Sequence, residues 1–126
     1  MGDPPNSTAP HGGLAPRPPR AARSPRRYAF VCFDGPDAAQ RRSAAIADHV
    51  RFMEAVWREV LVAGPLQDPA DGTVVGSLYV IAAADEVSAR RLLESDPFFV
   101  AGIWRETQLL GYTPALGTWI GGRIWD

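Results

Sequence analysis

One stretch of the sequence has the composition of the floor of a small-molecule site. It runs from Asp96 to Trp104 and reads Asp-Pro-Phe-Phe-Val-Ala-Gly-Ile-Trp. Aromatic walls beside a carboxylate suit flat, conjugated substrates and exclude water from a reacting group. Asp96 is therefore a candidate for acid–base chemistry, and Phe98, Phe99 and Trp104 are candidate substrate-binding residues. The same aromatics could equally be core and dimer contacts.

If a histidine is the acid–base partner of Asp96, the sequence offers only two candidates. His11 lies in a segment rich in proline and glycine, which leaves His49. An imidazole changes charge near neutral pH, so it can take a proton and return it without a cofactor. A carboxylate on its far nitrogen would fix the tautomer and stabilise the imidazolium. On the residues alone, however, His49 is more often a half-buried structural histidine, and Asp96 a turn residue.

Four segments have the pattern of β-strands. Residues 28–33 are rich in aromatic and β-branched side chains and stop at the turn signal Asp34-Gly35-Pro36. Three later apolar runs predict further strands: residues 61–64, 74–82 and 104–112. Pro65 is expected to end or border the second strand, because proline cannot donate to a sheet ladder.

A long helix is expected after the first strand, from about Asp37 to Val60. Its apolar residues recur with spacings of 4, 3, 4 and 3, at Ile46, Val50, Met53, Trp57 and Val60. This period places them on one helix face, which should pack on a sheet. Arg42 and His49 fall on the rim of that face.

A second helix is expected from Glu86 to about Ser95. Asp85 before it is a good N-cap, and Val87, Leu92 and Leu93 should face inward. The pair Asp96-Pro97 ends or redirects the helix, because the residue before a proline avoids the helical region.

The resulting order is strand, helix, strand, strand, helix, strand. It predicts an α+β fold of the ferredoxin-like type, an antiparallel sheet with both helices on one face. The other sheet face would be bare, so we expect a second copy to cover it in a homodimer. Ser77 and Tyr79 alternate onto one sheet face and could add hydroxyl groups to a pocket.

Length and composition predict the domain organisation and the cellular compartment. The chain has 126 residues, enough for one domain. Residues 1–26 are rich in proline and arginine and should be a disordered leader, residues 27–113 should form the α+β domain, and residues 114–126 a Trp- and Gly-rich extension that lies over the partner or the pocket mouth. No apolar run approaches the length of a membrane span and no secretory signal is evident, so a cytoplasmic protein is expected.

Other partner classes are disfavoured by charge and cysteine content. Residues 1–27 contain five arginines against one aspartate, whereas the whole chain has a net charge of −1. The folded part is therefore acidic, which argues against nucleic acid as a partner. Cys32 is the single cysteine and lies in an apolar run, which favours a buried, inert thiol. With two histidines and one cysteine, no metal site and no cofactor are expected.

With these pieces in place, the chain resembles the YCII-related family, small proteins of ferredoxin-like, dimeric α+β barrel fold. The resemblance covers about residues 28–113. The matching features are Arg42 followed seven residues later by His49, the triplet Ala63-Gly64-Pro65, and Asp96-Pro97-Phe98 followed by Ala101-Gly102. The resemblance implies an active site centred on His49 and Asp96. Family members often have an arginine three residues before the histidine; here Ile46 occupies that position, and Arg42 could replace it from one turn further back.

The resemblance also implies a class of function, since the fold is shared with cofactor-independent lactone isomerases and a dechlorinating enzyme. We expect a lyase- or isomerase-like enzyme in which His49 is the general base or acid and Asp96 its orienting partner. Its substrate would be a small molecule of a biosynthetic or degradative pathway, and elimination, isomerisation or cyclisation are the expected reactions. The alternative is a non-catalytic module that uses the same pocket to bind a small molecule or a partner.

Overall fold

A computed structural model describes residues 16–22 and 27–126 of the chain. Two compact units divide the chain: Pro25–Thr113, and Met1–Ser24 with Pro114–Asp126. Most of the predicted leader, at residues 1–15 and 23–26, lies outside the described residues.

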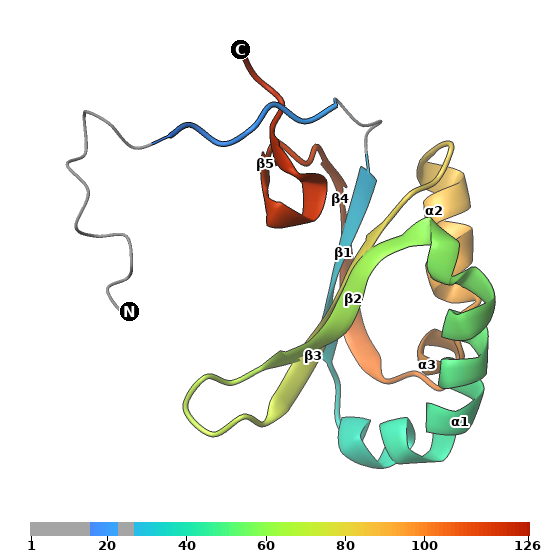
Figure 1. Cartoon of the computed structure of the whole chain (residues 1–126). Coiled ribbons are helices and arrows are strands. Elements are labelled where there is room, and N and C mark those ends of the chain that lie inside the picture. The colour runs from blue at the N-terminus through green and yellow to red at the C-terminus, as the bar shows by residue number, and fades with distance from the viewer. Residues whose placement is uncertain (1–15, 23–26) are drawn as a thin grey trace. The chain divides into compact units, whose positions relative to one another are not determined.

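The larger unit is a four-stranded antiparallel sheet with its helices on one face (Figure 1). The strand order is β2-β3-β1-β4. The elements in chain order are β1 (Arg27–Asp34), α1 (Ala38–Val56), the 3-10 helix η2 (Trp57–Glu59), β2 (Val60–Gln67), β3 (Val74–Ile81), α2 (Glu86–Glu94), the short helix α3 (Pro97–Val100) and β4 (Trp104–Tyr112). This arrangement confirms the predicted ferredoxin-like α+β fold.

The core lies between the sheet and the helices and is built on the two central strands. Phe30 of β1 pairs with Tyr79 of β3, and Cys32 pairs with Ser77, so their side chains share the helix-covered face. Cys32 is fully buried, which confirms the predicted burial of the thiol. Burial, followed by the charges of Asp96 and Asp34, raises the pKa of Cys32 to about 12. The thiol is therefore neutral and a poor nucleophile.

The predicted apolar face of the first helix is only partly buried. Met53 and Val60 pack against the core, as the period predicts. Ile46 and Val50 of α1 and Trp57 of η2 are exposed, and Trp57 keeps 61% of its surface accessible. Two small side chains of α1, Ala38 and Ala45, belong to the cluster that contains Phe98, and their size allows a close approach of α1 to α3.

The boundary between α1 and β2 also differs from the prediction. The helix ends at Val56 and the strand begins at Val60, so the apolar period continues about one turn beyond the end of the helix. Pro65 does not end β2, which continues to Gln67. Because β2 is an edge strand paired only with β3, a proline is tolerated there, where no second ladder needs its missing N–H.

Helix α2 begins at the predicted cap. Asp85 accepts a hydrogen bond from the Ser88 amide at the start of α2, as the sequence predicts. The inward residues of α2 are Ala89, which is fully buried, and Leu93, whereas Val87 is exposed and its predicted inward position is wrong. Val87 is two residues from Ala89, about 200° around the helix, so it points away from the core against which Ala89, Leu92 and Leu93 pack.

The sheet face opposite the helices carries apolar side chains. Val31 of β1 lies beside Leu78 of β3, and Ala29 lies beside Leu110 of β4. These positions alternate with the core residues and therefore point to the opposite face. Leu110 is 55% exposed. An apolar sheet face of this kind is a candidate interaction surface.

The smaller unit contains a short hairpin near the C-terminus. Its strands β5 (Leu116–Gly117) and β6 (Gly122–Arg123) are antiparallel and are joined by the 3-10 helix η3 (Thr118–Ile120). Arg20 forms a parallel bridge with Arg123, so part of the predicted leader is ordered against this hairpin. That the segment covers a pocket or a partner subunit stays a prediction. Within the described residues, no helix combines the length and apolar character that a membrane crossing requires.

Candidate active site

The two residues at the centre of the predicted site are in hydrogen-bond contact. His49 projects from α1, and Asp96 is the residue that precedes α3. His49 Nδ1 lies 2.8 Å from Asp96 Oδ1. The Asp96 side chain is fully buried, whereas 17% of the His49 side chain is exposed. The carboxylate thus lies behind the ring, and the ring lies between the carboxylate and solvent.

The local sequence around Asp96 explains its position. Pro97 fills the first position of α3, where its missing N–H is not needed, and Asp96 caps the helix by accepting from the Phe98 amide at 2.8 Å. The Tyr79 hydroxyl donates to Asp96 Oδ2 at 2.6 Å. Three donors therefore converge on one buried carboxylate, which offsets its lost hydration.

Tyr79 is fixed as a donor in this network. Burial, then the charge of Asp96 and the hydrogen bond to it, raise the pKa of Tyr79 well above its usual range. The phenol therefore stays protonated. Its hydrogen points at Asp96 and holds Oδ2, which leaves Oδ1 to His49 and the Phe98 amide.

The orientation of the His49 ring is set from a second direction. The ring stacks on Phe98, with centroids 3.6 Å apart and planes inclined by 2°. A carboxylate only accepts hydrogen bonds, so Nδ1 must carry the hydrogen that Asp96 receives. The other nitrogen, Nε2, then has a free lone pair, and no residue in the described part of the chain bonds to it. A fixed ring with one free basic nitrogen can accept a proton.

A cavity of about 420 Å³ lies beside this ring. Its volume suits a molecule of one ring. Most of its lining is apolar, from α1, β2, β3 and α3: Ile46, Met53, Ala63, Gly64, Pro65, Val74 and Phe98. The polar lining residues are Arg42, His49, Ser77 and Tyr79. The cavity therefore joins a basic nitrogen, hydrogen-bond donors and apolar walls.

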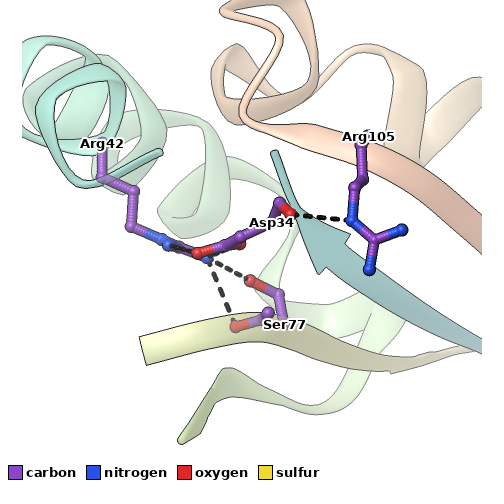
Figure 2. Close-up of polar contacts among 5 residues, drawn as sticks. Asp34, Arg42, Ser77 and Arg105 are labelled. Carbon is purple, nitrogen blue, oxygen red and sulfur yellow. Dashed lines mark hydrogen bonds and ion pairs between the residues drawn. The ribbon is translucent and has the colours of Figure 1, made fainter. Parts of the chain in front are cut away.

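Arg42 is held at the same cavity by an ion pair with the end of β1. Its Nη1 and Nη2 donate to the two carboxylate oxygens of Asp34 at 2.6 and 2.9 Å. Nη2 also donates to Ser77 Oγ at 3.1 Å and to the Gly76 carbonyl at 3.3 Å (Figure 2). Both side chains are mostly buried. This two-point geometry fixes the guanidinium plane.

The structure brings together most of the residues proposed from the sequence. His49, Arg42, Ser77, Tyr79 and Phe98 line the cavity, and Asp96 lies behind His49. Arg42 and His49, expected on the rim of the α1 face, lie on the side that faces the sheet.

Two proposed aromatics are not among the cavity-lining residues. Phe99 turns to the other side of α3 and packs against the sheet core. Trp104 packs edge-on against Tyr79 and Phe98, at centroid distances of 5.9 and 6.3 Å. Both support the residues that line the cavity rather than the cavity itself.

Asp34, the partner of Arg42, is a polar residue that sequence reasoning missed. In the sequence it reads as the first residue of a turn, and nothing near it signals a partner on the following helix. Within residues 16–22 and 27–126, no cluster of three or more His, Cys, Asp or Glu side chains could hold a metal ion.

Comparisons with known proteins agree with this fold and assign a family. The YCII-related domain matches residues 26–113. No curated protein matches significantly. The solved structure of 5-chloro-2-hydroxyhydroquinone dehydrochlorinase from Burkholderia phenoliruptrix, in complex with 2,5-dihydroxybenzoquinone, is 24% identical. The match covers 73% of this chain and 96% of that chain, with a TM-score of 0.64.

A second solved structure is SnoaB, a cofactor-independent oxygenase from Streptomyces nogalater. It is 13% identical, with 71% of this chain and 91% of that chain covered, at a TM-score of 0.41. Because the family match spans well over half of the chain, and with it the whole β-sheet unit from β1 to β4, the chain belongs to the YCII-related family.

Proposed function

We propose that this protein is a cofactor-independent enzyme that moves protons on a small organic molecule, with His49 as general base and acid and Asp96 as its positioning partner. The observation that carries the proposal is the 2.8 Å contact between His49 Nδ1 and a fully buried Asp96 carboxylate. This contact leaves Nε2 of a cavity-lining ring as the free basic atom.

The proton balance of the proposed step is simple. Nε2 accepts a proton from an O–H or an acidic C–H bond of the substrate, and the bonding electrons stay on the substrate. The imidazolium that forms is stabilised by Asp96 through Nδ1–H. The same proton then returns to another substrate atom in an isomerisation, or to a leaving group in an elimination. No other reactant is needed.

The rest of the cavity supports this chemistry. Phe98 and Met53 give the ring apolar neighbours, which lower its contact with water and strengthen electrostatic interactions inside the site. Arg42 and Ser77 offer hydrogen-bond donors that can orient a substrate oxygen. A dehydrochlorinase is among the proteins of this fold, which supports elimination as one of the candidate reactions.

A direct test uses the wild-type protein in D₂O with a panel of small cyclic ketones and hydroxylated aromatics. We expect proton NMR to show faster exchange of acidic C–H positions, or turnover, for at least one compound. Binding of several compounds without exchange or turnover of any would contradict catalysis and would favour the alternative, a module that only binds a ligand.

We further propose that the enzyme is a homodimer joined through the apolar sheet face that carries Val31, Leu78 and Leu110. Light scattering should give twice the chain mass of 13.6 kDa for the wild type. Leu110→Glu should give the monomer, because burying a carboxylate without a partner costs several kcal/mol, about 2–4 at least. Val87→Glu, at an exposed site on α2, is the matched control and should stay dimeric. A monomeric wild type would refute the proposal.

A further inference from the structure

The end of the cavity at Arg42 has no net charge of its own. The Arg42 guanidinium and the Asp34 carboxylate are paired through two hydrogen bonds of 2.6 and 2.9 Å. Their side chains are only 16% and 11% exposed, so little solvent screens the pair. Asp34 does not itself line the cavity, but its carboxylate is in direct contact with Arg42, so its repulsion of an anionic ligand group at Arg42 would largely offset the attraction.

The other charges near the site do not change this balance. Asp96 adds a buried negative charge behind His49, and His49 is neutral when it serves as a base. Arg105 also reaches Asp34, but its Nε donates to the backbone carbonyl at 3.2 Å, from the β4 side away from Arg42 (Figure 2). The Arg105 side chain is 62% exposed, and it is not among the residues that line the cavity. A carboxylate ligand would therefore meet a cavity with no excess of positive charge.

Hydrogen-bond donors nevertheless remain at this end. Within the described part of the chain, Nε–H of Arg42 and its second Nη1 hydrogen have no acceptor. Ser77 Oγ accepts from Arg42 at 3.1 Å, so its own hydrogen is free, and no described residue accepts it. Because Asp34 neutralises the charge of Arg42, these donors suit a neutral acceptor oxygen.

We infer that Asp34 is a specificity-determining residue: by neutralising Arg42, it makes this end of the cavity select an uncharged carbonyl or hydroxyl oxygen over a carboxylate. The inference rests on the proposed function and names its substrate class. The preferred substrate is a small, uncharged, one-ring molecule. It places an acceptor oxygen at Arg42 and Ser77 and an O–H or acidic C–H bond at His49 Nε2.

The test compares two probes of the same shape, 4-hydroxyacetophenone and 4-hydroxybenzoate, which differ in the charge of one substituent. Binding is followed by NMR titration at neutral pH. We expect the wild type to bind the ketone more tightly. Asp34→Asn should shift the ratio of the two dissociation constants towards the benzoate by about tenfold or more, because Arg42 then keeps an unpaired charge in a poorly solvated place.

Two further variants keep the result interpretable. Asp34→Asn combined with Arg42→Gln removes both charges and should restore the preference for the ketone, even if the single variant is less stable. Asp48→Asn makes the same charge change on the exposed side of α1, where Asp48 pairs with Arg51, and should leave the ratio at the wild-type value.

The inference is overturned if the wild type prefers the benzoate, if neither probe binds it, or if Asp34→Asn leaves the ratio unchanged. These failures are separate from failure of the proposed function. A ratio that moves with Asp34 in a protein without any turnover refutes the enzyme and keeps the charge selection. Turnover that depends on His49, together with a ratio that is unchanged in Asp34→Asn, supports the enzyme and refutes the charge selection.

Discussion

Replacement of His49 with glutamine is expected to lower kcat/KM by about 10²–10⁴-fold on any substrate that the wild type turns over, which is the usual contribution of a positioned general base. Glutamine keeps a polar, planar group at the site and can accept no proton at neutral pH. The measurement is steady-state kinetics on a compound that exchanges or reacts with the wild type in D₂O.

The fold of this variant should survive. The His49 side chain is partly exposed, and its ring contacts are the stacking on Phe98 and the hydrogen bond to Asp96. Ala47→Gln introduces the same side chain on the exposed side of α1 and is the matched control, with activity at the wild-type level. Wild-type kcat/KM in His49→Gln would remove His49 from the mechanism.

The architecture could be predicted from local pattern because each strand carries a strong signal. The segment from Trp104 to Tyr112 was predicted with its observed bounds, and the order of elements determined the antiparallel topology. Errors occur where tertiary packing overrides local preference. The first helix was extended to Val60 because an apolar period continues there, but Val60 pairs with Ile81 across the sheet. Pairing between distant strands leaves no trace in the period of one helix.

The orientation of α1 shows a second limit of the sequence. The hydrophobic period weights large side chains, so Ile46 and Val50 were placed inward. The contact between α1 and α3 is instead made by Ala38 and Ala45, whose size lets the two helices approach. Alanine contributes little to a hydrophobic pattern, but its small side chain permits close packing of two helices.

Residue types and the family resemblance predicted the residues of the candidate site. They did not predict the contacts that hold those residues in place. That His49 and Asp96 meet depends on the cap that Asp96 forms at α3, which the sequence suggests through Pro97. The interactions of Tyr79 with Asp96 and of Asp34 with Arg42 join residues on different elements, 17 and eight positions apart. No local spacing rule connects such residues, so only the folded chain identifies them.

Asp96 should be the residue whose replacement has the largest combined effect on stability and activity. Asp96→Ala removes the acceptor of three hydrogen bonds from a fully buried place and leaves the Tyr79 hydroxyl and the Phe98 amide without a partner. Each buried donor left unpaired costs about 1–3 kcal/mol. We expect the free energy of unfolding to fall by about 3–5 kcal/mol, measured by urea denaturation. Tyr79→Phe removes one donor from the buried carboxylate and keeps the other two, so it should cost about 1.5–3 kcal/mol.

Asp96→Asn separates the catalytic role from the structural one. The amide has nearly the same shape. Its oxygen can still accept from His49 Nδ1 and from the Phe98 amide, and its NH₂ group, in the place of Oδ2, can donate to the Tyr79 oxygen, so the stability loss should be smaller than in Asp96→Ala. The ring of His49 keeps its tautomer, but the neutral amide no longer stabilises the imidazolium that forms when Nε2 accepts a proton. We expect kcat/KM to fall by about 10²–10⁴-fold in a protein that remains folded. Wild-type activity in folded Asp96→Asn would show that the negative charge of Asp96 has no part in the reaction.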